Sequence, residues 1–258
     1  MPFSQWVLLH VPTLILMLIL VVGSVTLCVG GLVVVRRFVP HHRLKIHNDV
    51  AGPIFATIGV AYGVLLAFVV VIVWQNYDKS RVNVEKEANC MVDIYADVEC
   101  FPAEFKEAVR LAIREYDKTV VNEEWPMLAS GQSSAEARHI IRKLWKLFSA
   151  YWPTTDTERI FFAESVKKLN EMMELRRMRI LDSKTGVEPM LWFVLIAGAA
   201  VTISFIFFFG SENLVAQILM ASLLAVLISL ILLTVLLFDF PFTGDVSIKP
   251  TAFQEVLI

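Results

Sequence analysis

The sequence contains few charged residues. Only 19% of its 258 residues are Asp, Glu, Lys or Arg and 57% are hydrophobic, whereas soluble domains average about 25% and 45–50%. The net charge is −2, so the chain has no general positive field that would attract nucleic acid. This apolar excess predicts a protein whose side chains face lipid.

Cysteine is also scarce. Cys28, Cys90 and Cys100 have no metal-ligand spacing, and an odd number cannot pair completely, which argues against a zinc-dependent or disulfide-stapled fold. A disulfide between Cys90 and Cys100 remains an alternative. The sequence also lacks an alternating strand pattern and a Gly-rich phosphate loop, which argues against a nucleotide-binding α/β domain. We expect no cofactor.

Four apolar runs are free of Asp, Glu, Lys, Arg and His. They cover residues 11–35, 54–77, 190–211 and 214–238. Each is long enough for a helix that crosses about 30 Å of hydrocarbon, which takes about 20 residues. The first run has no charged segment before it and no small-residue cleavage site after it, so it predicts a retained span and not a removed signal peptide.

The order of these runs predicts the architecture. Four buried core helices of a soluble protein are excluded, because the rest of the chain is too small to cover them. We expect an all-α integral membrane protein with a first transmembrane hairpin (1–77), a helical soluble domain (78–188), a second hairpin (189–238) and a C-terminal tail (239–258).

The soluble domain has helical periodicity. Apolar residues from Tyr77 to Val98 recur at helical spacing, so one long helix is predicted to continue out of the second span until Pro102 interrupts it. A second helix is expected to stop before Trp125-Pro126. Two S/T-x-x-E patterns, which begin at Ser133 and Thr155, predict capped helices over 133–151 and 156–182.

Lys and Arg near the span ends indicate the orientation. The loop of the first hairpin holds four: Arg36, Arg37, Arg43 and Lys45. The flanks of the soluble domain and the tail hold eight: Lys79, Arg81, Lys86, Arg176, Arg177, Arg179, Lys184 and Lys249. This balance favours a cytoplasmic soluble domain in a multi-pass protein of the plasma (inner) membrane.

Candidate chemistry is sparse. The uncharged spans argue against a charge-coupled transporter. His41, His42 and His47, with Asp49, form a weak candidate metal site in the first loop, but a solvated basic loop is the better interpretation, since neither a further ligand set nor a nucleophile is visible. We therefore expect no enzyme; a membrane enzyme that uses these histidines is a third alternative.

The second span contains two rows of residues. The small row could let helix backbones approach closely: Gly52, Ala56, Gly59, Gly63 and Ala67. The bulky row could form a hydrophobic constriction around a shared axis: Phe55, Ile58, Tyr62 and Leu66. The alternative, in which the glycines only pack this helix on its own subunit's spans, carries equal weight.

Five segments resemble the bestrophin-like family of unknown function, domain of unknown function 4239. They are HNDVAGPIFATIGVAYGVLLAFVVVIVWQNYDKSRVNVEKEA (47–88), EEWP (123–126), RRMRI (176–180), EPMLWFVLIAGA (188–199) and DFPFTGDVSIKP (239–250). Bestrophins are pentameric anion channels whose second span lines an apolar neck, so the resemblance implies a neck within 54–66. The sequence departs from true bestrophins after the second span, where WQNYD (74–78) replaces an RWWE-like segment.

The sequence is compatible with two functions. The first is an oligomeric channel or channel-like membrane protein, a pentamer if it is bestrophin-like, which passes small anions through a pore lined by the second span. The alternative is a non-conducting, membrane-anchored interaction or assembly protein. The lipid bilayer is the expected environment for both.

Overall fold

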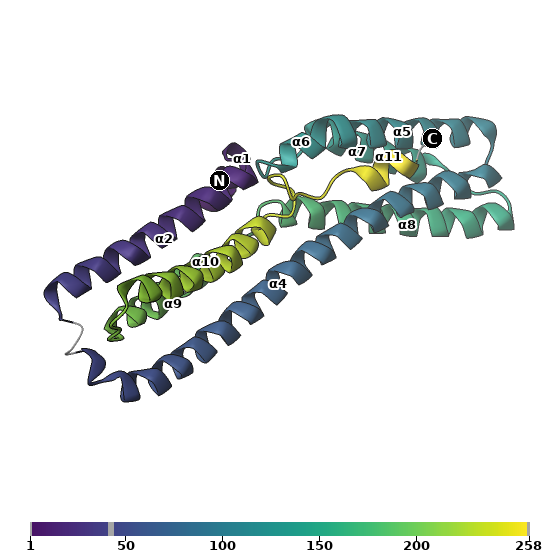
Figure 1. The fold of residues 1–258 in the computed structure, drawn as a ribbon. Helices are drawn as coiled ribbons and strands as arrows, with labels where there is room; N and C mark the ends of the chain where they lie inside the picture. Colours follow the sequence, from purple (N-terminus) through teal and green to yellow (C-terminus); the bar gives the residue numbers. More distant parts are fainter. Residues whose placement is uncertain (1, 41–43, 257–258) are drawn as a thin grey trace. The chain divides into compact units, whose positions relative to one another are not determined.

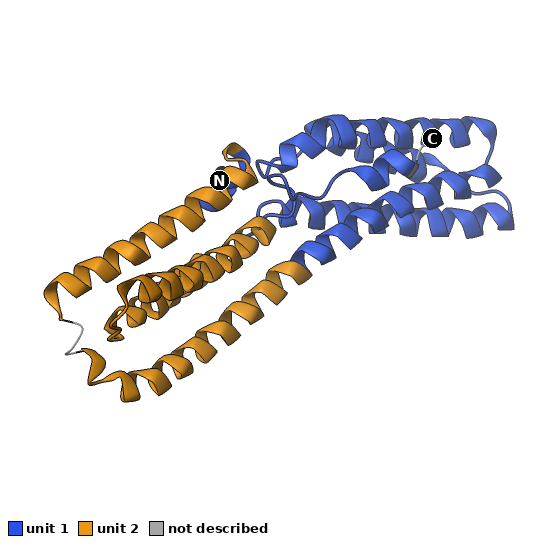
Figure 2. Cartoon of the chain, in the orientation of Figure 1, with its two compact units in different colours: residues 1–9, 76–186, 240–258 blue, residues 10–75, 187–239 orange. Residues whose placement is uncertain are grey.

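The computed structural model describes residues 2–40 and 44–256 of the chain, and every regular element among them is helical (Figure 1). The chain divides into two compact units (Figure 2). Unit 1 comprises residues 1–9, 76–186 and 240–258, and unit 2 comprises residues 10–75 and 187–239. The all-α class predicted from the sequence is confirmed for the described residues.

Unit 2 contains the apolar helices. They are α2 (Thr13–Phe38), the first part of α4 (Asn48–Asp97), α9 (Pro189–Phe205) with a 3-10 turn (Ile206–Phe208), and α10 (Leu214–Asp239). Each belongs to one of the four described segments that are long and apolar enough to cross a membrane, as predicted. Helices α2 and α10 pack side by side, and Ser229 Oγ donates to Ser24 Oγ at 2.6 Å.

Helix α4 is one continuous helix of 50 residues. Pro53 lies inside it, five residues after Asn48, where a proline removes one helical hydrogen bond. The helix ends at Asp97, a 3-10 turn (Val98–Cys100) follows, and Pro102 then precedes the next helix. The prediction that one long helix continues beyond the second span is confirmed.

Unit 1 is a helical bundle. It contains α1 (Phe3–His10) up to Leu9, the C-terminal part of α4, α5 (Ala103–Thr119), a π-helical turn (Val120–Glu124), α6 (Trp125–Leu128), α7 (Ala135–Ala150), α8 (Asp156–Asp182) and α11 (Thr251–Val256). Its core includes apolar side chains from α4, α5, α6, α7 and α8, together with Phe242, Ile248 and Phe253 from the C-terminal segment. The predicted helix 156–182 matches α8, and Thr155 Oγ1 accepts a hydrogen bond from the Glu158 backbone N–H.

Two details of unit 1 differ from the prediction. The helix expected to stop before Trp125 continues through the π-helical turn, because the Trp125 N–H donates to the Val120 carbonyl, five residues back. Pro126, which has no N–H to donate, then follows as the second residue of α6. The second difference is the cap of α7, which is Ser134 and not Ser133: Ser134 Oγ accepts from the N–H groups of Glu136 and Ala137.

The three cysteines are free. Cys28 and Cys90 are buried, while Cys100 is exposed. The alternative disulfide between Cys90 and Cys100 is therefore not formed.

Candidate functional site

The bulky row of α4 packs inside unit 2. Tyr62 is buried, and its hydroxyl donates to the Leu195 carbonyl at 2.8 Å. Gly198 of α9 makes room for this ring, since a Cβ at that position would lie 2.5 Å from Tyr62 Cε2. Leu66 is buried in the same cluster, and Phe55 stacks on Phe205 with ring centroids 5.8 Å apart. In this chain the row expected to line a neck is used for contact with α9.

Ile58, the fourth neck candidate, is half-buried. It lies on the side of α4 that carries Tyr62, four positions away, where helical residues share a face. The whole bulky row thus turns towards the chain's own helices, and the opposite side of α4 stays free.

The small row of α4 lacks a partner within the described chain. A Cβ built on Gly52, Gly59 or Gly63 would meet no described atom within 4 Å. Ala56 and Ala67 are exposed. The alternative in which the glycines pack this helix on its own subunit's spans therefore has no support among the described contacts.

The histidine loop shows no metal site in the part of the chain that is described. His41 and His42 lie outside the described residues, and His47 is exposed. Within residues 2–40 and 44–256, no group of three or more His, Cys, Asp and Glu side chains is arranged to hold a metal ion.

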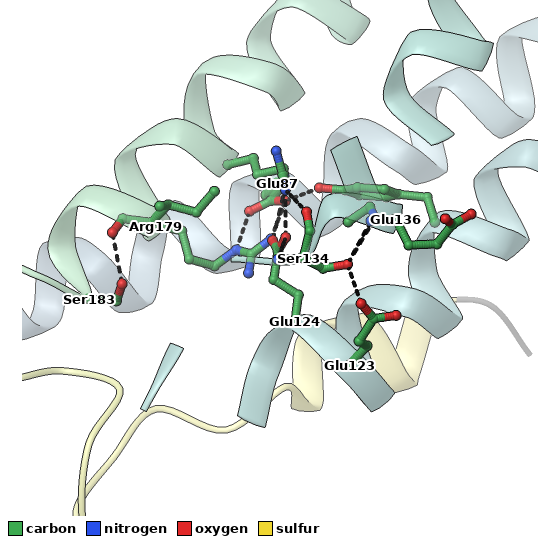
Figure 3. Close-up of polar contacts among 11 residues, drawn as sticks. Glu87, Glu123, Glu124, Ser134, Glu136, Arg179 and Ser183 are labelled. Carbon is green, nitrogen blue, oxygen red and sulfur yellow. Dashed lines mark hydrogen bonds and ion pairs between the residues drawn. The ribbon is translucent and has the colours of Figure 1, made fainter. Parts of the chain in front are cut away.

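A buried ionic network lies in unit 1 (Figure 3). The Arg179 guanidinium donates from Nε to Glu87 Oε2 at 2.7 Å and from Nη2 to Glu124 Oε1 at 3.0 Å. Arg176 Nη2 lies 2.5 Å from the other Glu124 oxygen. Tyr116 Oη donates to Glu87 at 2.7 Å. Two cations thus balance two carboxylates, and all four side chains are buried.

Burial and charge oppose each other in this network. Burial disfavours the charged form of Arg179, but Glu87 and Glu124 outweigh it and raise the pKa of the guanidinium. Burial and the neighbouring Glu87 raise the pKa of Tyr116 well above its ordinary value, so this side chain remains a neutral donor. Because a carboxylate buried without its cation is strongly destabilising, the network ties α4, α8 and the π-helical turn together.

The network reaches the C-terminal segment through aromatic rings. The Arg179 guanidinium carbon lies 5.3 Å from the Trp125 ring centroid and 5.6 Å from that of Phe253. Trp125 Nε1 donates to the Ile248 carbonyl at 3.1 Å. Arg179 Nη1 is buried and has no hydrogen-bond partner among the described residues. The C-terminal segment thus closes one side of the charged cluster.

No local pattern in the sequence predicts this network. Arg176 and Arg179 belong to the basic residues that indicate the orientation, although both are buried in the structure. The signal that could have found it is the set of resembling segments: 47–88 supplies Glu87, EEWP supplies Glu124 and Trp125, RRMRI supplies both arginines, and 239–250 supplies Ile248. The most distinctive residues of these segments therefore meet at one place in unit 1.

A known protein family has the same all-helical membrane architecture, and its model matches most of this chain. The family model described as "Bestrophin-like domain" matches residues 22–253. The chain belongs to the bestrophin-like family. It is a multi-pass integral membrane protein with a channel-like architecture.

Solved structures share the fold of this bestrophin-like chain at low identity. A bacterial bestrophin homologue from Klebsiella pneumoniae, solved by Zn-SAD phasing, is 12% identical with a TM-score of 0.66, covering 90% of this chain and 93% of that chain. A point-mutant crystal structure of the homologue from the same organism has a TM-score of 0.67 at 12% identity, covering 90% and 94%. The crystal structure of a membrane protein with a proline-to-alanine substitution has a TM-score of 0.68 at 12% identity, with the same coverage. No curated protein matches the chain.

Proposed function

We propose that this bestrophin-like protein is an oligomeric channel of the plasma (inner) membrane that passes small anions along an axis surrounded by copies of α4. The observation that carries the proposal is the uncovered face of α4 within an uncharged span. A single copy with four spans free of charged residues offers no polar path for water or ions. Several copies whose α4 helices face one axis would create one.

The exposed face of α4 suggests which residues form the neck. Val60, Val64 and Phe68 are spaced four residues apart and are 68%, 50% and 65% exposed. Residues at this spacing lie on one face of a helix. In the proposed oligomer these three side chains form stacked apolar rings, which gate by excluding water, while the neighbouring small row packs against the next copy. The four bulky residues keep their contacts within the chain.

Electrical recording tests the proposal. Purified protein in planar bilayers is expected to carry a current that reverses near the chloride equilibrium potential, and its mass in lipid should equal several copies, five if it is assembled as the bestrophins are. Val64→Ala, which widens the proposed neck, should increase the current. Leu227→Ala is the matched control, because Leu227 is an exposed apolar residue of α10.

Two results would contradict this function. Absence of chloride current together with a monomeric mass would remove the route for ions. Equal responses of Val64→Ala and Leu227→Ala would show that Val64 does not line the path.

A second candidate, a non-conducting interaction protein, is favoured by one observation. Trp152 is 84% exposed and Ile160 is 70% exposed, both at the end of unit 1 where α7 connects to α8. Aromatic residues such as Trp152 are enriched where proteins bind one another. Crosslinking that captures a different subunit, and never a second copy of this chain, would favour this candidate over the channel.

A further inference from the structure

A cavity lies in unit 2 at the link between α9 and α10. Its volume is about 490 Å³. Its apolar wall is formed by Phe55, Ile206, Phe209, Met220 and Leu224. Such a wall fits a hydrocarbon chain, since burial of each CH₂ group contributes about 0.8 kcal/mol.

The polar side chains in the cavity wall are already engaged. Asn48 Nδ2 donates to the Gly210 carbonyl at 2.9 Å, and the Gly210 N–H donates back to Asn48 Oδ1 at 3.0 Å. Gln217 Nε2 donates to the Phe209 carbonyl at 2.9 Å. Ser211 Oγ donates to the Asn213 carbonyl at 3.1 Å. The interior therefore favours an apolar occupant over a polar metabolite.

A cation stands beside this apolar space. Arg36 Nε donates to Gln217 Oε1 at 3.0 Å, and Arg36 Nη2 donates to the same oxygen and to the Ser211 carbonyl. Gln217 and Ser211 both line the cavity. All of these acceptors are neutral, and Arg36 forms no ion pair with any described residue. Its half-buried charge is therefore available to an anion.

The expected depth of the cavity in the membrane is compatible with a bound lipid. Polar residues of the link, with the exposed Lys45–Glu212 ion pair at 2.6 Å, indicate the level of the headgroups. The lining residues of α10 extend from Gln217 to Leu224. These positions are seven residues apart, which corresponds to about 10 Å along the helix axis. Half of the hydrocarbon core is about 15 Å deep. The cavity wall is therefore long enough to contact the part of one acyl chain that is nearest the headgroup.

We propose that this cavity binds an anionic phospholipid, with its phosphate near Arg36 and one acyl chain against Phe55, Met220 and Leu224. The proposal does not depend on the proposed channel function. It requires only that unit 2 lies in a bilayer. Arg37, the next residue of α2, is exposed and adds positive charge at the same level.

Lipid binding to the delipidated full-length protein tests the site. Native mass spectrometry would compare retention of phosphatidylglycerol with that of diacylglycerol of the same chain length, which lacks the phosphate. Phosphatidylglycerol should bind more tightly. Arg36→Gln should weaken its binding about tenfold, the effect expected for loss of one charge-assisted hydrogen bond, without changing that of diacylglycerol.

A matched pair of variants tests the apolar part. Met220→Trp places a large side chain in the cavity and should reduce retention of both lipids. Leu219→Trp is its control, because Leu219 is exposed on the same helix and does not line the cavity. Melting temperatures of all variants would show that they fold.

Three outcomes would overturn the proposal. Equal retention of the two lipids would remove the role of Arg36. Displacement of the lipid by inorganic phosphate alone would show that only the headgroup is bound. A change of oligomeric mass in Met220→Trp without loss of lipid would identify the cavity as a contact between copies. Since none of these readouts is a current, failure of this site and failure of the channel are distinguishable.

Discussion

Among single residues, Arg179 makes the most direct prediction about the stability of unit 1. It is fully buried and contacts Glu87 and Glu124 together. Arg179→Met leaves both carboxylates without this cation, which costs about 3–5 kcal/mol for buried pairs. We expect a large drop in the melting temperature of the detergent-solubilised protein, followed by intrinsic tryptophan fluorescence.

The control for Arg179 is an exposed arginine. Arg159 pairs with Asp156 at 3.1 Å, and both side chains are more than half exposed. Exposed pairs contribute little to stability, so Arg159→Met should have the same melting temperature as the wild type. If the two variants melted alike, the buried network would not stabilise unit 1 in the way its geometry indicates.

Asp117 gives unit 1 a pH dependence. Burial raises the pKa of Asp117 from 3.8 to about 6, and its Oδ1 has no hydrogen-bond partner among the described residues. Because the folded pKa exceeds the unfolded one, the stability that the neutral carboxyl contributes is complete below about pH 4. It is lost as the pH rises through about 6.

Replacement of Asp117 tests this sign. Asp117→Asn should be more stable than the wild type at pH 7.5, and the difference should vanish near pH 4. Melting temperatures over that range would show it. Glu174→Gln, at an exposed position of α8, should follow the wild-type curve throughout. A stability difference for Asp117→Asn that did not change with pH would contradict the assignment.

At the scale of elements, the start of α7 depends on a single serine. Ser134 is fully buried; its Oγ accepts from two backbone N–H groups and donates to Glu123 Oε1, and its own N–H donates to Glu124 (Figure 3). Ser134→Ala should therefore cost about 1–2 kcal/mol. Ser133→Ala is the matched control and should change the melting temperature little. If Ser133→Ala lowered the melting temperature more than Ser134→Ala, Ser133 would be the cap of α7.

The elements show how far the sequence could predict the structure. Apolar length alone located the four spans, and the S/T-x-x-E pattern at Thr155 gave the start of α8, because both signals are local. The pattern at Ser133 failed since two adjacent serines satisfy nearly the same rule and tertiary contacts with Glu123 and Glu124 select the second. The π-helical turn has no local signal at all.

The same limit applies to the candidate site. Periodicity identified the bulky and small rows of α4, but it could not tell which row contacts the chain's own helices. That choice depends on Gly198, 136 positions from Tyr62, which leaves room for the tyrosine ring. The buried ionic network was missed for the same reason, because its charges come from segments far apart in the sequence.

At the scale of the whole molecule, the small row of α4 leads to a prediction about assembly. A Cβ at Gly59 meets no described atom within 4 Å, so Gly59→Leu should leave the fold of one copy intact. If the row packs against a neighbouring copy, the larger side chain prevents close approach of the two backbones. The oligomer should then dissociate or lose copies, which mass photometry in nanodiscs would measure.

Gly23→Leu provides the comparison for this last prediction. Gly23 lies on α2 and is equally open among the described residues, so its replacement adds the same volume to another span. It should keep the wild-type mass, because α4 and not α2 is proposed to face the axis. Equal masses for the wild type and both variants would mean that copies of the chain associate through some other surface, and the proposed pore around α4 would lose its main structural support.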